Sequence, residues 1–336
     1  PRRRRAASRI CSPMSRIVTS WFSTLSRKFT AIAVRRCLSV TLIGLLGFAG
    51  SAAVGIVVGI PAPTVTDEFS YLLAADTFAH GRLTNPPHPL WVHFESVHII
   101  QQPTYMSKFP PGQGLVLAAG QVLADQPIVG VWIGFALMCA AICWMLYAWV
   151  PPRWALLGGF LAIINPQLGI AGYWAQSYWG GAVPAIGGAL VLGGVRRLMR
   201  RPGVKDALLT SIGLAILANS RPYEGLLISL PAGVILLRWI FSKRGPFLRV
   251  SLGRIVLPTL FALALTGAAM GLYNLRVTGN PLRLPYQVHE ETYGIAPLFI
   301  WQSLPPEPAY RHQALRDRHR QVGRGLYDIQ RSVAGF

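Results

Sequence analysis

Charged residues are scarce in this chain, and acidic residues are the scarcest of them. Only 13% of the 336 residues are charged, whereas 52% are hydrophobic, and 12 Asp and Glu stand against 32 Lys and Arg. A soluble domain carries about twice this charged fraction, so the composition excludes an ordinary soluble protein. Cysteine is also rare, with residues Cys11, Cys37, Cys139 and Cys143. None of the four falls in a loop that the charge pattern places outside the membrane, which excludes a disulfide framework.

Long uncharged runs are present instead, and they predict the fold class. Uncharged residues fill 38–60, 126–150, 154–195, 207–220, 225–237 and 255–275. A helix of about 20 apolar residues crosses ~30 Å of hydrocarbon, and 154–195 is long enough for two crossings. The segments 207–220 and 225–237 are either two short spans or one hairpin. We therefore expect an all-α, polytopic transmembrane bundle of about seven spans.

The net charge of +20 could indicate a nucleic-acid partner, but the placement of the charges argues against one. With the N-terminus in the cytoplasm, 21 of the 32 basic residues fall in 1–36, 195–205, 238–254 and at Arg153. Eleven of the 12 acidic residues fall on the opposite side. This is the positive-inside pattern of membrane proteins. We expect a basic, interfacial N-terminal segment at 1–36, a transmembrane core at 37–275 and an extracytoplasmic segment at 276–336, all in contact with membrane lipids.

The first outer loop, 61–125, is long for a connection and rich in aromatic residues, His and Pro. The sequence predicts a helix from Thr66 to about Ala79, in an interfacial position. Asp67 and Glu68 open it, and two acids there can simply favour the positive end of the helix dipole. The alternative is functional, because a carboxylate between water and the bilayer can act as a general base on an incoming hydroxyl.

Lys108 precedes a Pro-Pro-Gly turn that closes the loop, and the following apolar stretch, 115–124, is too short to span. The lysine either snorkels to the headgroups or binds a lipid phosphate. Arg221 and Glu224 lie at a later outer turn, where Arg221 either pairs with Glu224 or faces a phosphate. His93, Glu95 and His98 are weak metal candidates, because polar loop histidines explain the same pattern.

Three motifs resemble the GT-C membrane glycosyltransferases. They are the acids at 67–68 after the first span, the Lys-Phe-Pro-Pro-Gly turn at 108–112 and Ser-Arg-Pro-Tyr-Glu at 220–224. The chain is most similar to bacterial protein O-mannosyltransferase-like and aminoarabinose transferase-like members, over about 38–300. Residues 273–282 also resemble such members. The resemblance implies an inverting glycosyltransferase of the bacterial plasma membrane, with its first loop extracytoplasmic.

The resemblance also implies roles for single residues. The donor would be a sugar on a polyprenyl phosphate, and the acceptor a lipid, a glycan or a protein. Asp67 matches the catalytic base, and Glu68 matches an acid that orients the acceptor. Lys108 and Arg221 would bind the donor phosphate, so no cofactor is required, although some relatives hold a divalent cation. Further substrate-binding candidates are Tyr71, Tyr105 and Glu224.

Family members usually have more spans and often a C-terminal outer domain, so we expect either a fragment or a short branch. A basic amphipathic helix is predicted within 305–336. The competing interpretation is a lipid or solute transporter or flippase. Such proteins place ionisable residues near the bilayer midplane and often contain repeats. This chain has nearly charge-free spans and no evident repeat, which favours chemistry at the surface.

Overall fold

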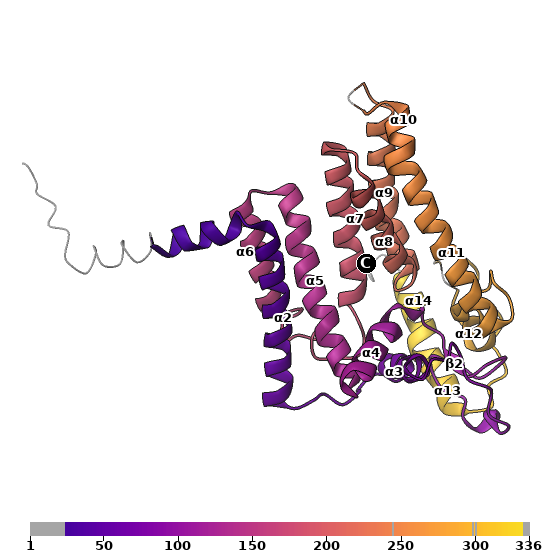
Figure 1. Ribbon diagram of the computed structural model, residues 1–336. Coiled ribbons are helices and arrows are strands. Elements are labelled where there is room, and N and C mark those ends of the chain that lie inside the picture. The colour runs from indigo at the N-terminus through magenta and orange to yellow at the C-terminus, as the bar shows by residue number, and fades with distance from the viewer. Residues whose placement is uncertain (1–23, 244, 298, 300, 332–336) are drawn as a thin grey trace, which may run out of the picture.

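The computed structural model describes residues 24–243, 245–297, 299 and 301–331. Most of the basic N-terminal segment, 1–23, lies outside this range. Residues 24–33 are helical and lie across the start of α2 (Figure 1). The hydroxyl of Tyr147 donates to the carbonyl of Ala33 over 2.7 Å, so this short helix is tied to the bundle.

The predicted all-α class is confirmed, and apolar helices form the bundle. Its members in the described residues are α2 (Arg36–Val58), α5 (Pro127–Trp149), α6 (Pro152–Ile164), α7 (Ala182–Arg200), α8 (Val204–Ala218), α9 (Pro222–Ile240) and α11 (Leu257–Thr278). Five segments are long and apolar enough to cross a membrane: α2, α5, α7, α9 and the continuous stretch 248–278 that ends in α11. The helices α6 and α8, with 13 and 15 residues, are shorter than a full crossing. The expected seven spans therefore correspond to five long helices and two short ones.

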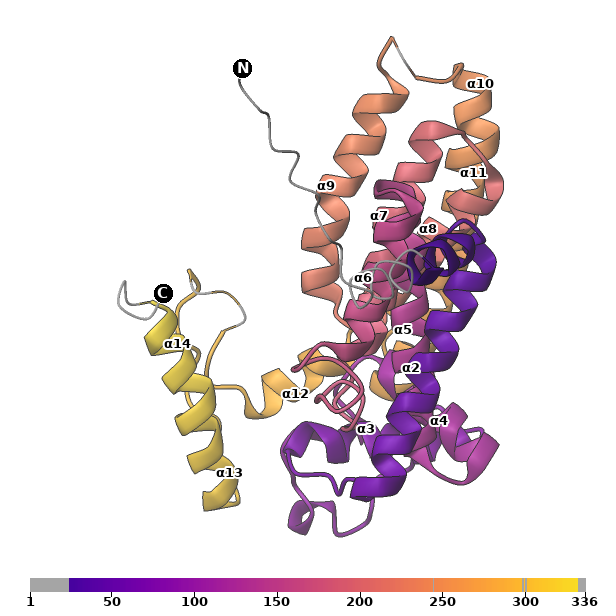
Figure 2. The ribbon, with the colours of Figure 1, turned by 90° about the vertical axis from the view of Figure 1, so that its left-hand side faces the viewer.

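The segment 207–237 forms two antiparallel helices, α8 and α9, joined at residues 219–221 (Figure 1). The basic turns after α7 and after α9 lie at one end of the bundle, which we call the basic end. At the basic end, α10 (Leu248–Ser251) and the π-turn η2 (Leu252–Val256) lead directly into α11. The long first loop and α12 (Pro285–Tyr293) lie at the other end, which we call the site end (Figures 1 and 2).

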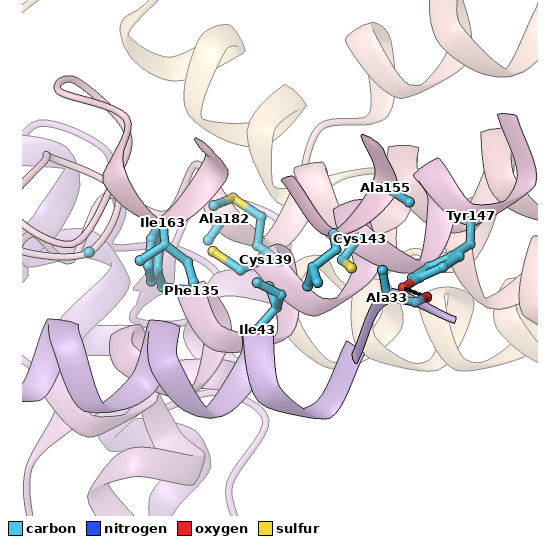
Figure 3. Packing of buried hydrophobic residues seen from close by; sticks show 12 residues of the cluster. Ala33, Ile43, Phe135, Cys139, Cys143, Tyr147, Ala155, Ile163 and Ala182 are labelled. Carbon is cyan, nitrogen blue, oxygen red and sulfur yellow. Dashed lines mark hydrogen bonds between the residues drawn. The ribbon is translucent and has the colours of Figure 1, made fainter. Parts of the chain in front are cut away.

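The bundle core forms where small side chains let helices approach closely. The buried residues of α2 recur every four positions as Ser39, Ile43, Gly47, Ser51 and Gly55. Such a row of mostly small residues permits close packing without relying on the hydrophobic effect. Ile43 packs there with residues of α5 and α6 (Figure 3). Cys139 and Cys143 belong to this cluster as buried free thiols.

Two helices cover the site end roughly crosswise to the bundle, α3 (Thr66–Ala79) and α4 (Pro111–Ala124) (Figure 2). The predicted helix at 66–79 is thus confirmed, and 115–124 lies in a helix that does not span. A Cβ on Gly120 of α4 would lie 2.1 Å from the backbone nitrogen of Gly130 in α5. Glycine is therefore required for α4 to rest on α5.

The rest of the first loop is held by short elements. It contains the 3-10 turn η1 (Trp91–His93) and the antiparallel strands β1 (Ile99–Ile100) and β2 (Met106–Ser107). The C-terminal segment returns to this loop, since α12 packs on β1 and on α11. It ends in a helical arm, α13 (Gln313–Arg318), η3 (His319–Arg324) and α14 (Gly325–Gln330), which occupies the predicted amphipathic region. Figure 2 shows this arm standing beside the bundle.

Candidate functional site

A cavity of about 710 Å³ lies at the site end, between α3, the turn joining α8 to α9, α11 and α12. Its polar wall carries both signs of charge. The charged side chains that line it are Asp67, Lys108, Arg221 and Glu224. Together with Tyr71, five of the residues singled out from the sequence as catalytic, phosphate-binding or substrate-binding are thus brought together, although they come from three separate stretches of the chain.

Asp67 reaches the cavity because the start of α3 is fixed by its neighbour. One carboxylate oxygen of Glu68 accepts the backbone N–H groups of Thr64 and Val65, at 2.8 and 3.1 Å. The other oxygen accepts the N–H of Tyr178 over 2.9 Å, and Glu68 is only 1% exposed. These bonds satisfy N–H groups at the helix start and tie α3 to the loop between α6 and α7. Glu68 therefore holds Asp67 in place, which differs from the acceptor-orienting role that the resemblance implied.

The carboxylate of Asp67 contacts the side chain of His98. Nε2 of His98 lies 3.4 Å from Oδ2 of Asp67, and both side chains are about one fifth exposed. Burial raises the pKa of the Asp67 carboxyl, but the hydrogen-bonding contact with His98 and the positive charge of the more distant Lys108 outweigh burial and lower the pKa overall. The carboxylate is thereby kept ionised, as a general base requires.

Lys108 is buried and faces a carboxylate that sequence reasoning missed. Its Nζ donates to Oε1 of Glu290 over 2.9 Å, and its side chain is 8% exposed. The Nζ atom also lies 4.9 Å from the centre of the Tyr286 ring, within cation–π range. Burial raises the pKa of Glu290, but its contacts with His289 and Lys108 outweigh burial and lower the pKa to about 2. Glu290 is therefore a fixed anion that holds the Lys108 ammonium at the cavity wall.

Arg221 and Glu224 form a looser pair at the turn between α8 and α9. Their charged atoms are 3.4 Å apart, and the side chains are 41% and 60% exposed. A pair this exposed contributes little to stability, so Arg221 can turn to another anion at small cost. The turn is fixed against the first loop, because the N–H of Gly112 donates to the carbonyl of Asn219 over 2.7 Å.

Tyr71 and Tyr105, both substrate candidates, lie in different places. Tyr71 lines the cavity and stacks on Phe109 at 4.7 Å between ring centres. Burial raises the pKa of its phenol to about 12, so it stays protonated. Tyr105 instead pairs with Asn85 through two backbone hydrogen bonds, and the described cavity wall does not include it. Of the two, Tyr71 alone is placed to touch a substrate there.

The weak metal candidates do not converge. His93 is exposed on η1, while His98 faces Asp67. Glu95 accepts from the hydroxyl of Tyr293 and from Arg311, each over 2.9 Å. Among the described residues, no group of three His, Cys, Asp or Glu side chains could hold a metal ion. Through these two bonds, Glu95 ties the loop after η1 to the C-terminal segment.

The remaining wall of the cavity is apolar. It is formed by residues of α8, α9 and α11 together with the loop after α12, and includes Leu214, Leu217, Leu226, Leu263, Met270 and Phe299. Trp179 also lines the cavity and packs edge-on against Tyr173. A site with this composition can hold an amphipathic ligand, with its charged group near Lys108 and its apolar part between the helices.

Comparison of the chain with protein-family models, with curated proteins and with solved structures finds no match.

Proposed function

We propose that the chain is a membrane glycosyltransferase that moves a sugar from a polyprenyl phosphate to an acceptor hydroxyl. One observation carries the proposal. A single cavity places an ionised carboxylate, Asp67, with two cations, Lys108 and Arg221. It continues into an apolar wall formed by the short helix α8 and by α9 and α11, which belong to segments long enough to span a membrane. A base, a phosphate-binding group and a lipid-compatible surface are what this transfer requires.

In the proposed reaction, Asp67 accepts the proton of the acceptor hydroxyl. The acceptor oxygen forms a bond to the anomeric carbon on the face opposite the phosphate, and the bond from that carbon to the phosphate oxygen breaks. The electron pair leaves with the phosphate, and the configuration of the sugar is inverted. Positioned cations stabilise charge that develops in such a transition state, and Lys108 and Arg221 supply two of them.

The ion pairs in the site fit this scheme. Arg221 is held only by an exposed partner at 3.4 Å, so a phosphate can replace Glu224 there. Lys108 has three N–H donors and uses one on Glu290, which leaves two for a phosphate. Tyr71, with its protonated phenol facing the cavity, can donate a hydrogen bond to the sugar or the phosphate.

The site end would face away from the cytoplasm, in the plasma membrane of a bacterium. The basic turns collect at the opposite end of the bundle, and basic loops favour the cytoplasmic side. The donor would enter sideways from the bilayer, because the apolar cavity wall is built from α8, α9 and α11. The acceptor is a lipid, a glycan or a protein that carries a free hydroxyl.

The proposal is tested with the purified protein in lipid vesicles and a panel of radiolabelled sugars on polyprenyl phosphate. The wild type should transfer sugar, whereas Asp67→Asn and Lys108→Ala should not, with all three eluting as the same folded species. Asp76→Asn is a matched control, because Asp76 lies on the same helix but is 53% exposed and contacts Arg82 and His80 instead. Uptake of a solute or lipid into vesicles without any transfer would favour the transporter interpretation.

A further inference from the structure

His98 occupies an unusual backbone conformation next to Asp67. Its φ is 66°, in the left-handed region that residues other than glycine seldom adopt. Such strain persists only where the surroundings hold it, and three bonds do so here. The carbonyl of His98 accepts from Ser70 Oγ at 2.7 Å and from the N–H of Lys108 at 3.1 Å, while its own N–H donates to Nε2 of His289 at 3.2 Å.

These three bonds come from three parts of the molecule. Ser70 belongs to α3, one helical turn after Asp67, Lys108 follows β2, and His289 belongs to α12. The backbone of His98 is therefore the point at which the base, the phosphate-binding lysine and the C-terminal segment are joined. The interaction with α12 spans 191 residues of sequence, so it could not be read from local patterns.

The protonation of His289 follows from its two contacts. Its Nε2 accepts from the N–H of His98, so the ring proton must be on Nδ1, which lies 3.2 Å from Oε1 of Glu290. A neutral ring in this tautomer satisfies both neighbours, whereas an imidazolium would place an N–H against an N–H. Burial lowers the pKa of His289 to about 4, which is consistent with the neutral form.

The side chain of His98 is then directed at the base. Its Nε2 lies 3.4 Å from Oδ2 of Asp67, and its ring lies 5.3 Å from that of Phe109. Its Nδ1 is buried and finds no hydrogen-bond partner among the described residues. An N–H on Nδ1 would be buried without an acceptor, which favours the tautomer with its proton on Nε2, facing the carboxylate.

We infer that His98 is a positioning residue for Asp67. Its Nε2–H engages Oδ2, so that Oδ1 is the oxygen left to take the proton of the acceptor, and His289 fixes the backbone that presents it. This inference rests on the proposed function, because the acceptor hydroxyl that gives up this proton belongs to the proposed sugar transfer. The contact between His98 and Asp67 can be tested without any transfer.

Several charged and titratable groups surround His98 and must be considered in a pH experiment. They are Asp67 of α3, Lys108 after β2, His289 and Glu290 of α12 and His319 of η3. The test therefore has to report on Asp67 itself rather than on overall activity. A dicyclohexylcarbodiimide probe does so, because it reacts with a carboxyl group only when that group is protonated, and the modified residue is identified by peptide mass spectrometry.

Two variants form a matched pair. Asparagine and glutamine carry the same amide, and asparagine tolerates a positive φ. In His98→Gln the amide nitrogen can reach the position of Nε2, whereas in His98→Asn it is one methylene too short. In the purified, unliganded protein, the pH of half-maximal Asp67 labelling should rise by about one unit in His98→Asn, a tenfold change in protonation, and by clearly less in His98→Gln. The pH dependence of Glu224 labelling, in the same cavity, should be the same in the wild type and both variants.

The same shift should appear in the acidic limb of the pH profile of transfer. A role limited to folding would lower the active fraction without moving that limb. Identical labelling curves in the wild type, His98→Asn and His98→Gln would overturn the inference even if the wild type transfers sugar. If the wild type transfers no sugar from any donor but the labelling shifts as stated, the proposed function fails and the positioning of Asp67 by His98 stands.

Discussion

Replacing His289 with glutamine should make the protein less sensitive to mild acid. His289 is 1% exposed, and burial lowers the pKa of its imidazole from 6.5 to about 4. Between these two values the unfolded chain binds a proton that the folded protein does not. Stability is therefore fully present above about pH 6.5 and is lost as the pH falls toward 4.

The size of this effect follows from the two pKa values. Each pKa unit corresponds to about 1.4 kcal/mol, so the full loss is about 3 kcal/mol, of which about 2 kcal/mol is already lost at pH 5. Glutamine does not titrate in this range, so His289→Gln should lack this part of the pH dependence, although it is less stable than the wild type at neutral pH.

The assay is denaturant unfolding in detergent, followed by tryptophan fluorescence, at intervals from about pH 7.5 to about pH 5. The quantity compared is the difference in the free energy of unfolding between the wild type and His289→Gln, because the titrating groups that do not contact His289 cancel in it, and the neighbouring Glu290, with a pKa of about 2, stays ionised over this pH range. That difference should shrink by about 2 kcal/mol as the pH falls to 5. Parallel curves for the two proteins would refute a buried, neutral His289 bonded to His98 and Glu290.

Three further predictions concern the parts that hold the site. Glu68→Gln replaces a buried carboxylate that accepts three backbone N–H groups, so unfolding should become easier by about 1–3 kcal/mol, and transfer should weaken because Asp67 moves; unchanged melting would contradict the positioning role. Gly112→Ala places a Cβ 2.6 Å from the carbonyl oxygen of Asn219, so it should raise the KM for the donor through Arg221, whereas Gly188→Ala, with open space around it, should not. Incubation with EDTA should leave transfer unchanged, since Lys108 and Arg221 supply the phosphate-binding charge; activity restored only by a divalent cation would show that the two side chains are insufficient.

The bundle and the first interfacial helix were predictable because their signals are local. The run 38–60 corresponds to α2, 126–150 to α5, and the helix at 66–79 has the predicted bounds. The expected number of full spans was less well predicted. Hydropathy counts apolar residues but does not say whether a helix such as α6 stops after 13 residues at Asn165.

Half of the candidate site was predictable and half was not. Asp67 and Lys108 stand out in a sequence with few charges, next to turns and spans that place them at one surface. Glu290 and His289 could not be assigned, because they reach Lys108 and His98 only after α12 folds back over 182 and 191 residues. The run His-Glu-Glu at 289–291 was the available signal, but nothing local connects it to the first loop. The role of Glu68 was hidden because its partners are backbone N–H groups, which carry no sequence signature.

The central claim is that one cavity carries out sugar transfer with Asp67 as its base. The most direct measurement is the rate at which purified wild type and Asp67→Asn, in the same vesicles, move a labelled sugar from polyprenyl phosphate to a hydroxyl acceptor. Loss of a general base costs about 10²–10⁴-fold in rate, so the variant should fall at least that far while it still binds the donor. Transfer by Asp67→Asn at the wild-type rate would contradict the account.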